Sequence, residues 1–113
     1  MNTMTRIVDT LTAQHIAAFL PGRHEGMCTS AYVAVEDGGV IQTGKTTGRH
    51  VYTLTAMVPF GTPSAMGALL NSIRSAMRAM PTLRPTGEQS PDMIDEEHGA
   101  YCVTVEYSAL CSL

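Results

Sequence analysis

A strand-like stretch, residues 46–60, places the firmest limit on what this chain can fold into. Five of its first ten residues are β-branched, a composition that favours extended backbone over helix. Leu54, Ala56 and Val58 then alternate with threonine and methionine, which is the two-residue period of a strand. We therefore predict a strand over residues 51–60 and no helix in this part of the chain.

The residues that lead into this stretch, 39–46, match the phosphate-loop consensus G-x-x-x-x-G-K-S/T. A phosphate loop needs a helix directly after its lysine, because the helix N-terminus supplies N–H groups and a partial positive charge for the phosphates. Here Lys45 leads into the strand, and Gly48 falls where the first helical turn would be. We interpret the motif as a chance match in a glycine-rich loop and predict no nucleotide or other cofactor.

Composition favours a single small domain over residues 1–113. With 113 residues and 44% apolar residues, the chain can bury a core without disulfides, although it contains three cysteines. The net charge of −3 argues against nucleic acid as the main partner. No apolar run reaches the length of a membrane span, and the first residues lack a secretory signal pattern, so we expect no membrane partner and cytosolic synthesis.

Apolar periodicity predicts an α+β domain with an antiparallel or mixed sheet of three to four strands and both helices packed on one face. The expected order is helix, strand, strand, helix, a possible short strand, strand. The predicted elements are a helix capped by Thr3 or Thr5 and running to about residue 20, a loop over 22–30, a strand over 31–36, a long mobile glycine-rich loop over 37–49, the strand over 51–60, a helix over 63–80, a loop or edge strand over 82–95 with a short strand at 93–94, and a strand over 100–111.

The second helix has the clearest pattern. Thr62 is a good N-cap, Pro63 suits the first helical position and Pro81 ends the helix. Arg74 and Arg78 fall on a different face from the apolar stripe. The residues of the stripe, which we expect to face the core, are Met66, Leu69, Leu70, Ile73, Met77 and Met80.

Two His-x-x-x-Cys pairs, His24 with Cys28 and His98 with Cys102, offer the four ligands of a tetrahedral zinc site. The spacing is not that of a standard zinc finger, and the site forms only if a loop cysteine meets a mid-strand cysteine. The same residues contain the elements of a Cys–His nucleophile, but nothing nearby marks an activated thiol. We interpret them as surface histidines and inert small cysteines, and we predict no metal site and no catalytic residue.

The order of elements resembles that of the tail terminator proteins of long-tailed bacteriophages and the related tail-completion and neck proteins. The shared plan includes a helix of the form Pro-x-x-x-x-x-Leu-Leu-x-x-Ile-x-x-x-Met, followed by a proline-rich acidic segment and a last strand. The resemblance covers nearly the whole chain and rests on pattern rather than on an invariant motif. The matching stretches are residues 7–19, 32–35, 51–58, 63–80 and 101–109.

The resemblance implies a structural virion protein and not an enzyme. Tail terminators form a ring, typically a hexamer, at the head-proximal end of the tail, and they join the tail to the head connector. The expected partners are copies of the chain itself, the tail tube protein and head–tail connector proteins, with at most incidental contact with passing DNA. The expected location is the tail or neck of the virion, and the host cytoplasm during assembly.

The resemblance also implies where subunits touch, because such rings are joined through sheet edges and long loops. The glycine-rich loop, over residues 40–50, is expected to reach a neighbouring subunit or the lumen of the tail tube. Lys45 and Arg49 are expected to contact acidic groups there. Two alternatives stay open: another tail or neck component such as a tube protein, and a small cytosolic enzyme or ligand-binding domain. The candidate contact residues are Val40, Ile41, Lys45, Arg49 and His50 in the loop, and Asp92, Asp95, Glu96 and Glu97 in the acidic segment.

Overall fold

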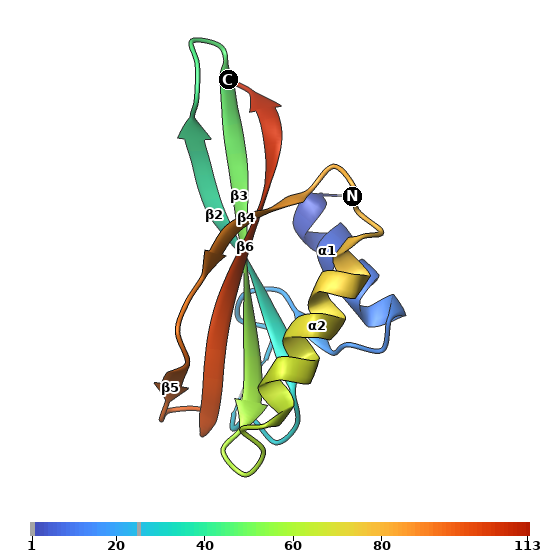
Figure 1. Ribbon diagram of the computed structural model, residues 1–113, viewed down its shortest axis with the longest axis vertical. Coiled ribbons are helices and arrows are strands. Elements are labelled where there is room, and N and C mark those ends of the chain that lie inside the picture. Colours follow the sequence, from blue (N-terminus) through green and yellow to red (C-terminus); the bar gives the residue numbers. More distant parts are fainter. Residues whose placement is uncertain (1, 25) are drawn as a thin grey trace.

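Three long antiparallel strands form the centre of the fold (Figure 1). The computed structural model describes residues 2–24 and 26–113, so the loop expected over 22–30 includes one position outside the described residues. The strand order is β1-β2-β3-β6-β4, with β5 also paired to β6. β1 joins in parallel and every other pairing is antiparallel. The strands are β1 (Ala18–Phe19), β2 (Tyr32–Gln42), β3 (Thr47–Pro59), β4 (Arg84–Gln89), β5 (Met93–Asp95) and β6 (Ala100–Ser112).

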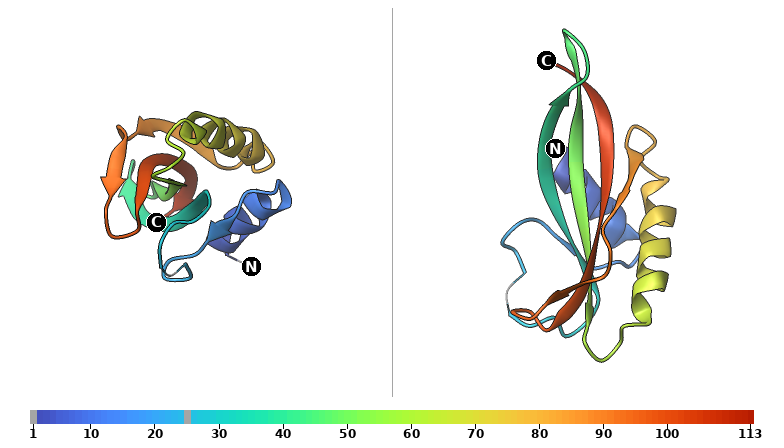
Figure 2. Two further views of the ribbon diagram at one scale, coloured as in Figure 1. Left: turned by 90° about the horizontal axis from the view of Figure 1, so that it is seen from below. Right: turned by 60° about the vertical axis from the view of Figure 1, so that its left-hand side comes forward.

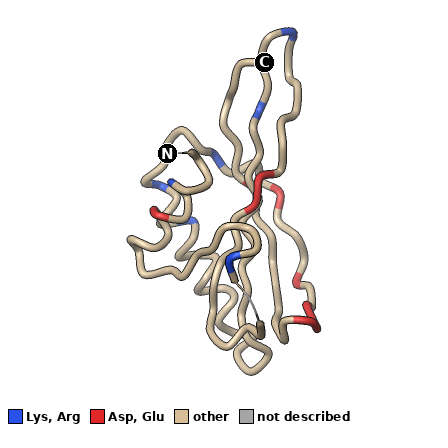
Figure 3. The backbone as a smooth tube through the Cα atoms, turned by 180° about the vertical axis from the view of Figure 1, so that it is seen from behind, with Lys and Arg blue, Asp and Glu red and all other residues tan. Residues whose placement is uncertain are grey.

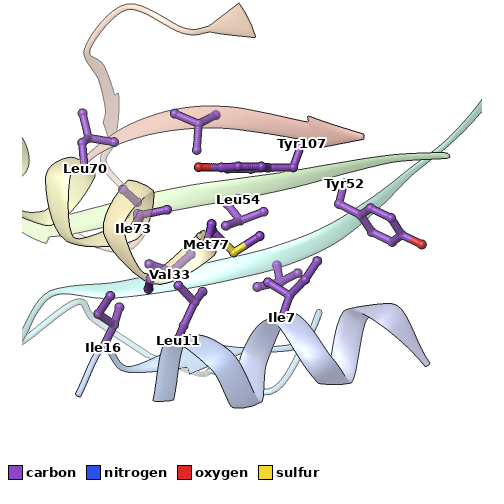
Figure 4. Packing of buried hydrophobic residues seen from close by; sticks show 14 of the residues in the cluster. Ile7, Leu11, Ile16, Val33, Tyr52, Leu54, Leu70, Ile73, Met77 and Tyr107 are labelled. Atoms are coloured by element: carbon purple, nitrogen blue, oxygen red, sulfur yellow. The ribbon is translucent and has the colours of Figure 1, made fainter. Parts of the chain in front are cut away.

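Two helices, α1 (Thr3–Ala13) and α2 (Ala65–Met77), cover one face of the sheet (Figure 2). Their apolar side chains form a single core with the strands, in which Ile7, Leu11, Leu54 and Ile73 are fully buried (Figure 4). The predicted α+β class with both helices on one face is therefore right. The expected three to four strands were too few, because the sheet has six.

Helix α1 is shorter than predicted. Its N-cap is Asn2, whose Oδ1 accepts a hydrogen bond of 2.8 Å from the Thr5 N–H, rather than Thr3 or Thr5. The helix ends at Ala13, and His15 then adopts a left-handed conformation with φ of 63°, which stops the helical run. The residues expected to continue the helix instead form β1, which gains backbone hydrogen bonds from β2.

Helix α2 buries the predicted stripe, with Met66, Leu70, Ile73 and Met77 in the core and Leu69 half-buried. It ends at Met77, three residues earlier than predicted, and Met80 is buried just beyond it. It begins two residues later than expected, at Ala65. Thr62 does not cap it, because the Thr62 hydroxyl donates to the Pro59 carbonyl at 3.3 Å. The Thr62 carbonyl accepts from the Ala65 N–H at 3.0 Å, so a tight turn precedes the helix.

The prediction of a long mobile loop over 37–49 is wrong. β2 continues to Gln42 and β3 begins at Thr47, so only residues 43–46 make the turn of a hairpin. A bulge at Asp37–Gly39, where Gly39 has a φ of 87°, lets the glycine pair fit within the strand. Cross-strand hydrogen bonds to β3 outweigh the weak strand propensity of these residues.

The last third of the chain follows the prediction closely. β5 pairs with β6 as expected, and residues 96–99 form the turn between them. The segment before β5 is an edge strand, β4, with an irregular register between Pro85 and Gln89. β6 turns Val103, Val105 and Tyr107 into the helix-covered core.

A ribbon of three strands extends beyond the helices at one end of the molecule (Figure 1). We call this projection the arm; it consists of residues 39–51, with the hairpin turn, and residues 108–113. It gives the molecule its elongated shape, with extents of 48 × 26 × 24 Å. Gly48, Val51 and Ser108 are buried, but most other residues of the arm are exposed, and these are the first candidates for contact with another molecule.

Candidate functional site

The arm exposes apolar side chains on both faces. Ile41, Arg49 and Leu110 are register partners and therefore share one face, where Ile41 is 59% and Leu110 is 73% exposed. Val40 shares the opposite face with His50. Lys45 is exposed in the hairpin turn. The five loop residues expected to make contacts thus lie together on the arm, although on a strand ribbon rather than a mobile loop.

Polar contacts stiffen the base of the arm. The Asp37 carboxylate accepts from the Gly39 N–H at 2.7 Å and bonds to Nε2 of His50 at 2.8 Å. The Gly39 N–H and, after it, the His50 ring lower the pKa of Asp37 below its usual value. The Arg49 guanidinium donates to the Ser108 hydroxyl at 3.2 Å across to β6. Two of the predicted contact residues, Arg49 and His50, are therefore tied to the ribbon itself.

Both edges of the arm lack a neighbouring strand among the described residues. β1 pairs with β2 only at Val33 and Ala34, which leaves the outer edge of β2 open from there to its end. On the other side, the furthest pair between β4 and β6 is Arg84 with Ser108, so the last residues of β6 are also open. Open edges present unpaired N–H and C=O groups that can accept another strand.

The acidic residues predicted as contacts lie at the other end of the sheet, around the turn between β5 and β6 (Figure 3). Asp95 is held inside this turn, since its carboxylate bonds to Nδ1 of His98 at 2.8 Å and to the His98 N–H at 3.1 Å. Partial burial would raise the pKa of Asp95, but the hydrogen bonds from His98 outweigh it and lower the pKa. Asp92, Glu96 and Glu97 are exposed. The nine predicted contact residues therefore form two groups at opposite ends, not one site.

The residues that match the phosphate-loop consensus, 39–46, lie at the end of β2 and in the hairpin turn that connects it to β3. The chain after Lys45 continues into β3 rather than into a helix. The two His-x-x-x-Cys pairs do approach each other, since the Cys28 N–H donates to the His98 carbonyl at 2.7 Å. Their four ligand atoms do not converge within the part of the chain that the structure describes, where the close set is Asp95, Glu97 and His98. Cys28 and Cys102 instead belong to a small apolar cluster on the far face of the sheet.

One feature was not singled out from the sequence: a groove between α2, β4 and β6 that carries three arginines. It is a hollow of about 440 Å³, and we call it the arginine groove. Arg74 comes from α2 and Arg78 is its C-cap residue; both fall outside the apolar stripe, which was the available signal, and Arg84 comes from β4. Burial raises the pKa of Tyr107 in its floor, with Arg74 partly offsetting the effect. The lining residues are Arg74, Met77, Arg78, Pro81, Leu83, Arg84, Pro85 and Tyr107.

Comparison with protein-family models found none that matches the chain, and comparison with curated proteins found no match either. Of the described residues, no helix is both long enough and apolar enough to cross a bilayer. The arguments for function therefore rest on the arm, the acidic residues around the turn between β5 and β6, and the arginine groove.

Proposed function

We propose that the chain is a structural subunit that assembles with copies of itself into a ring and serves where a phage tail joins the head. The arm carries this proposal, because it combines two open strand edges with exposed apolar side chains. A ring of this kind, typically a hexamer, would contact the tail tube protein on one side and head–tail connector proteins on the other. The tail terminator resemblance in element order supports this role.

The strand directions in the arm suit repetition around a ring. β2 and β6 both run antiparallel to β3 and therefore parallel to each other. If arms of neighbouring copies stand side by side and point the same way, the open edge of β2 meets the open edge of β6 as a parallel pair. The two edges differ, so the contact is heterologous and each copy keeps one edge for the next copy.

The apolar residues of the arm provide a driving force for such a contact. Val40, Ile41, Leu110 and Leu113 are all more than half exposed, at 51%, 59%, 73% and 58%. Burying a side chain of this size contributes roughly 1.5–3 kcal/mol relative to full exposure. Two or three of them covered by a neighbour would therefore offset a substantial part of the entropy lost on association.

The test is the assembly state of the purified chain, measured by light scattering and negative-stain microscopy. We expect closed rings. Deleting Ile41, Gln42, Gly48 and Arg49 removes two pairs in register and keeps the turn, so this variant should fold but remain monomeric. Helical tubes would favour a tube protein, and a monomer at all concentrations would favour the enzyme or ligand-binding alternative; both results would overturn the ring.

A milder variant separates lost apolar contact from a changed backbone. Ile41→Thr combined with Leu110→Thr places a β-branched residue with high strand propensity at both positions while removing apolar surface from one face of the arm. The matched control is Met27→Thr, since Met27 is similarly exposed, at 57%, but lies away from the arm. We expect the arm variant to weaken assembly and the control to assemble normally; equal behaviour of the two would contradict the role of the arm.

A further inference from the structure

The arginine groove concentrates positive charge in a chain whose net charge is −3. None of the aspartates and glutamates that the structure describes lines the groove. Within the described residues, Arg78 and Arg84 have neither an ion-pair partner nor a side-chain hydrogen bond, and Arg74 donates to the neutral Gln89 side chain at 2.6 Å. Guanidinium groups bind carboxylates through paired, charge-assisted hydrogen bonds. The groove therefore offers three cationic groups to an acidic partner.

The floor and walls of the groove limit what kind of acidic partner fits. Met77, Leu83 and Tyr107 are buried apolar residues that contribute to the lining, together with two prolines. A partner that fills this hollow needs an apolar side chain with carboxylates beside it. A bare phosphate backbone would match the charge but not the apolar walls, and the net charge of the chain opposes nucleic acid.

The same chain carries a segment with this chemistry. Ile94 in β5 is 64% exposed and Met93 is 37% exposed. The exposed carboxylates of Asp92, Glu96 and Glu97 flank them, with no ion-pair partner in the part of the chain described. We call residues 92–97 the acidic turn. It presents an apolar side chain bordered by three negative charges, the complement of the arginine groove.

The acidic turn cannot reach the groove of its own molecule. Asp95 pairs with Ala100 at the start of β6, whereas the groove contains Tyr107, seven residues further along the same strand. At roughly 3.3 Å per residue this separation is about 23 Å along a rigid strand. Any contact between the two features must therefore join two copies of the chain.

We infer that the acidic turn of one copy docks in the arginine groove of the next, with Ile94 in the hollow and the carboxylates against the guanidinium groups. This contact rests on the proposed self-assembly and adds a second, electrostatic surface to the arm. If each copy docks its acidic turn in the next copy and accepts the turn of the previous one, the contact is heterologous and repeats from copy to copy until a ring closes. Electrostatic complementarity of this kind fixes which surfaces meet and in what register.

A charge-swap experiment tests this contact. One variant carries Arg78→Glu and Arg84→Glu, and the other carries Asp92→Arg, Glu96→Arg and Glu97→Arg, which makes the acidic turn positive. In each variant alone, turn and groove have the same sign, so assembly should weaken at least about tenfold. In an equimolar mixture the turn of each variant meets a groove of opposite charge in the other, and assembly measured by sedimentation velocity should return. The control pair Arg6→Glu and Arg23→Glu makes the same charge change outside the groove and should leave assembly unchanged.

The outcomes separate this contact from the proposed ring. If the wild type forms rings and both charge variants do so equally well, the docking contact is wrong while the ring stands. If each variant fails and the mixture fails too, the complementarity is wrong, provided that circular dichroism shows both variants folded. Binding of a short DNA duplex that the Arg78→Glu and Arg84→Glu variant loses, with assembly unaffected, would assign the groove to nucleic acid. A wild type that stays monomeric overturns both proposals.

Discussion

At the scale of single residues, the three cysteines differ in the surroundings of their thiols. Cys28 and Cys102 are buried, and burial, with the Asp95 carboxylate adding to it, raises the pKa of both thiols. Cys111 lies on the arm and is partly exposed. Since the thiolate is the reactive form, Ellman's reagent should label one thiol quickly and two at least roughly tenfold more slowly in the folded protein. Cys111→Ser should abolish the fast phase; a fast phase that survives this change would contradict the assignment.

The Asp37 carboxylate should make stability depend on pH in the acid range. Its pKa is lowered in the folded state by the Gly39 N–H and by His50, below a usual value of 3.8. A lowered folded pKa stabilises the protein above the usual value, and this stabilisation is lost as the pH falls through the folded value. The urea concentration at which half of the wild-type protein is unfolded should therefore decrease as the pH is lowered from about 5 to about 3.

Asp37→Asn is the variant that checks this effect. It should lower the midpoint near pH 5 and show a shallower fall toward pH 3, with the remaining slope coming in part from the lowered pKa of Asp95. Asp92→Asn leaves the Asp37 hydrogen bonds intact and should retain the wild-type slope. Identical slopes for the wild type and Asp37→Asn would rule out this carboxylate as the source.

At the scale of elements, two glycines should respond to alanine with opposite signs. Gly39 has a φ of 87° in the bulge of β2, so Gly39→Ala should destabilise the protein by roughly 1–2 kcal/mol. Gly67 is exposed in helix α2, with no atom within 4 Å of an added Cβ, so Gly67→Ala should stabilise it by roughly 0.5–1 kcal/mol. Urea unfolding of the two variants measures both. A neutral Gly39→Ala would mean that the bulge is not required for the register of the arm.

The elements that the sequence predicted well are those whose signals are local. Helix α2 and strand β6 each carry a regular apolar period along their whole length, and their core faces came out as expected. The distal part of β2 lacked such a signal, because Gly38 and Gly39 suit a loop as well as a bulge. Its strand structure comes from hydrogen bonds to β3. The residues immediately around this part of β2 do not include those partners, so local sequence could not predict the strand.

At the scale of the whole molecule, the candidate surfaces depend on which segments the fold brings together. The acidic turn could be read from the sequence because its carboxylates are close neighbours in the chain. The arginine groove could not, since Arg78 and Arg84 come from different elements and their floor residue, Tyr107, comes from a third. The same reason explains why the arm, rather than a flexible loop, was found only in the structure.

The length of β3 has a consequence for local stability. Its second half, from Leu54 to Val58, lies between two strands under the helices, where alternate side chains are fully buried. Its first residues, 47–51, belong to the arm, which extends beyond the two helices (Figure 1). Amide hydrogen exchange should therefore show a gradient along this one strand, with protection falling steadily toward Thr47. It is best measured by NMR on the variant with Ile41→Thr and Leu110→Thr, at a concentration where that variant is monomeric. One continuous strand would then contain amides whose hydrogens exchange only when the whole protein unfolds, and amides whose hydrogens exchange when the end of the arm opens locally.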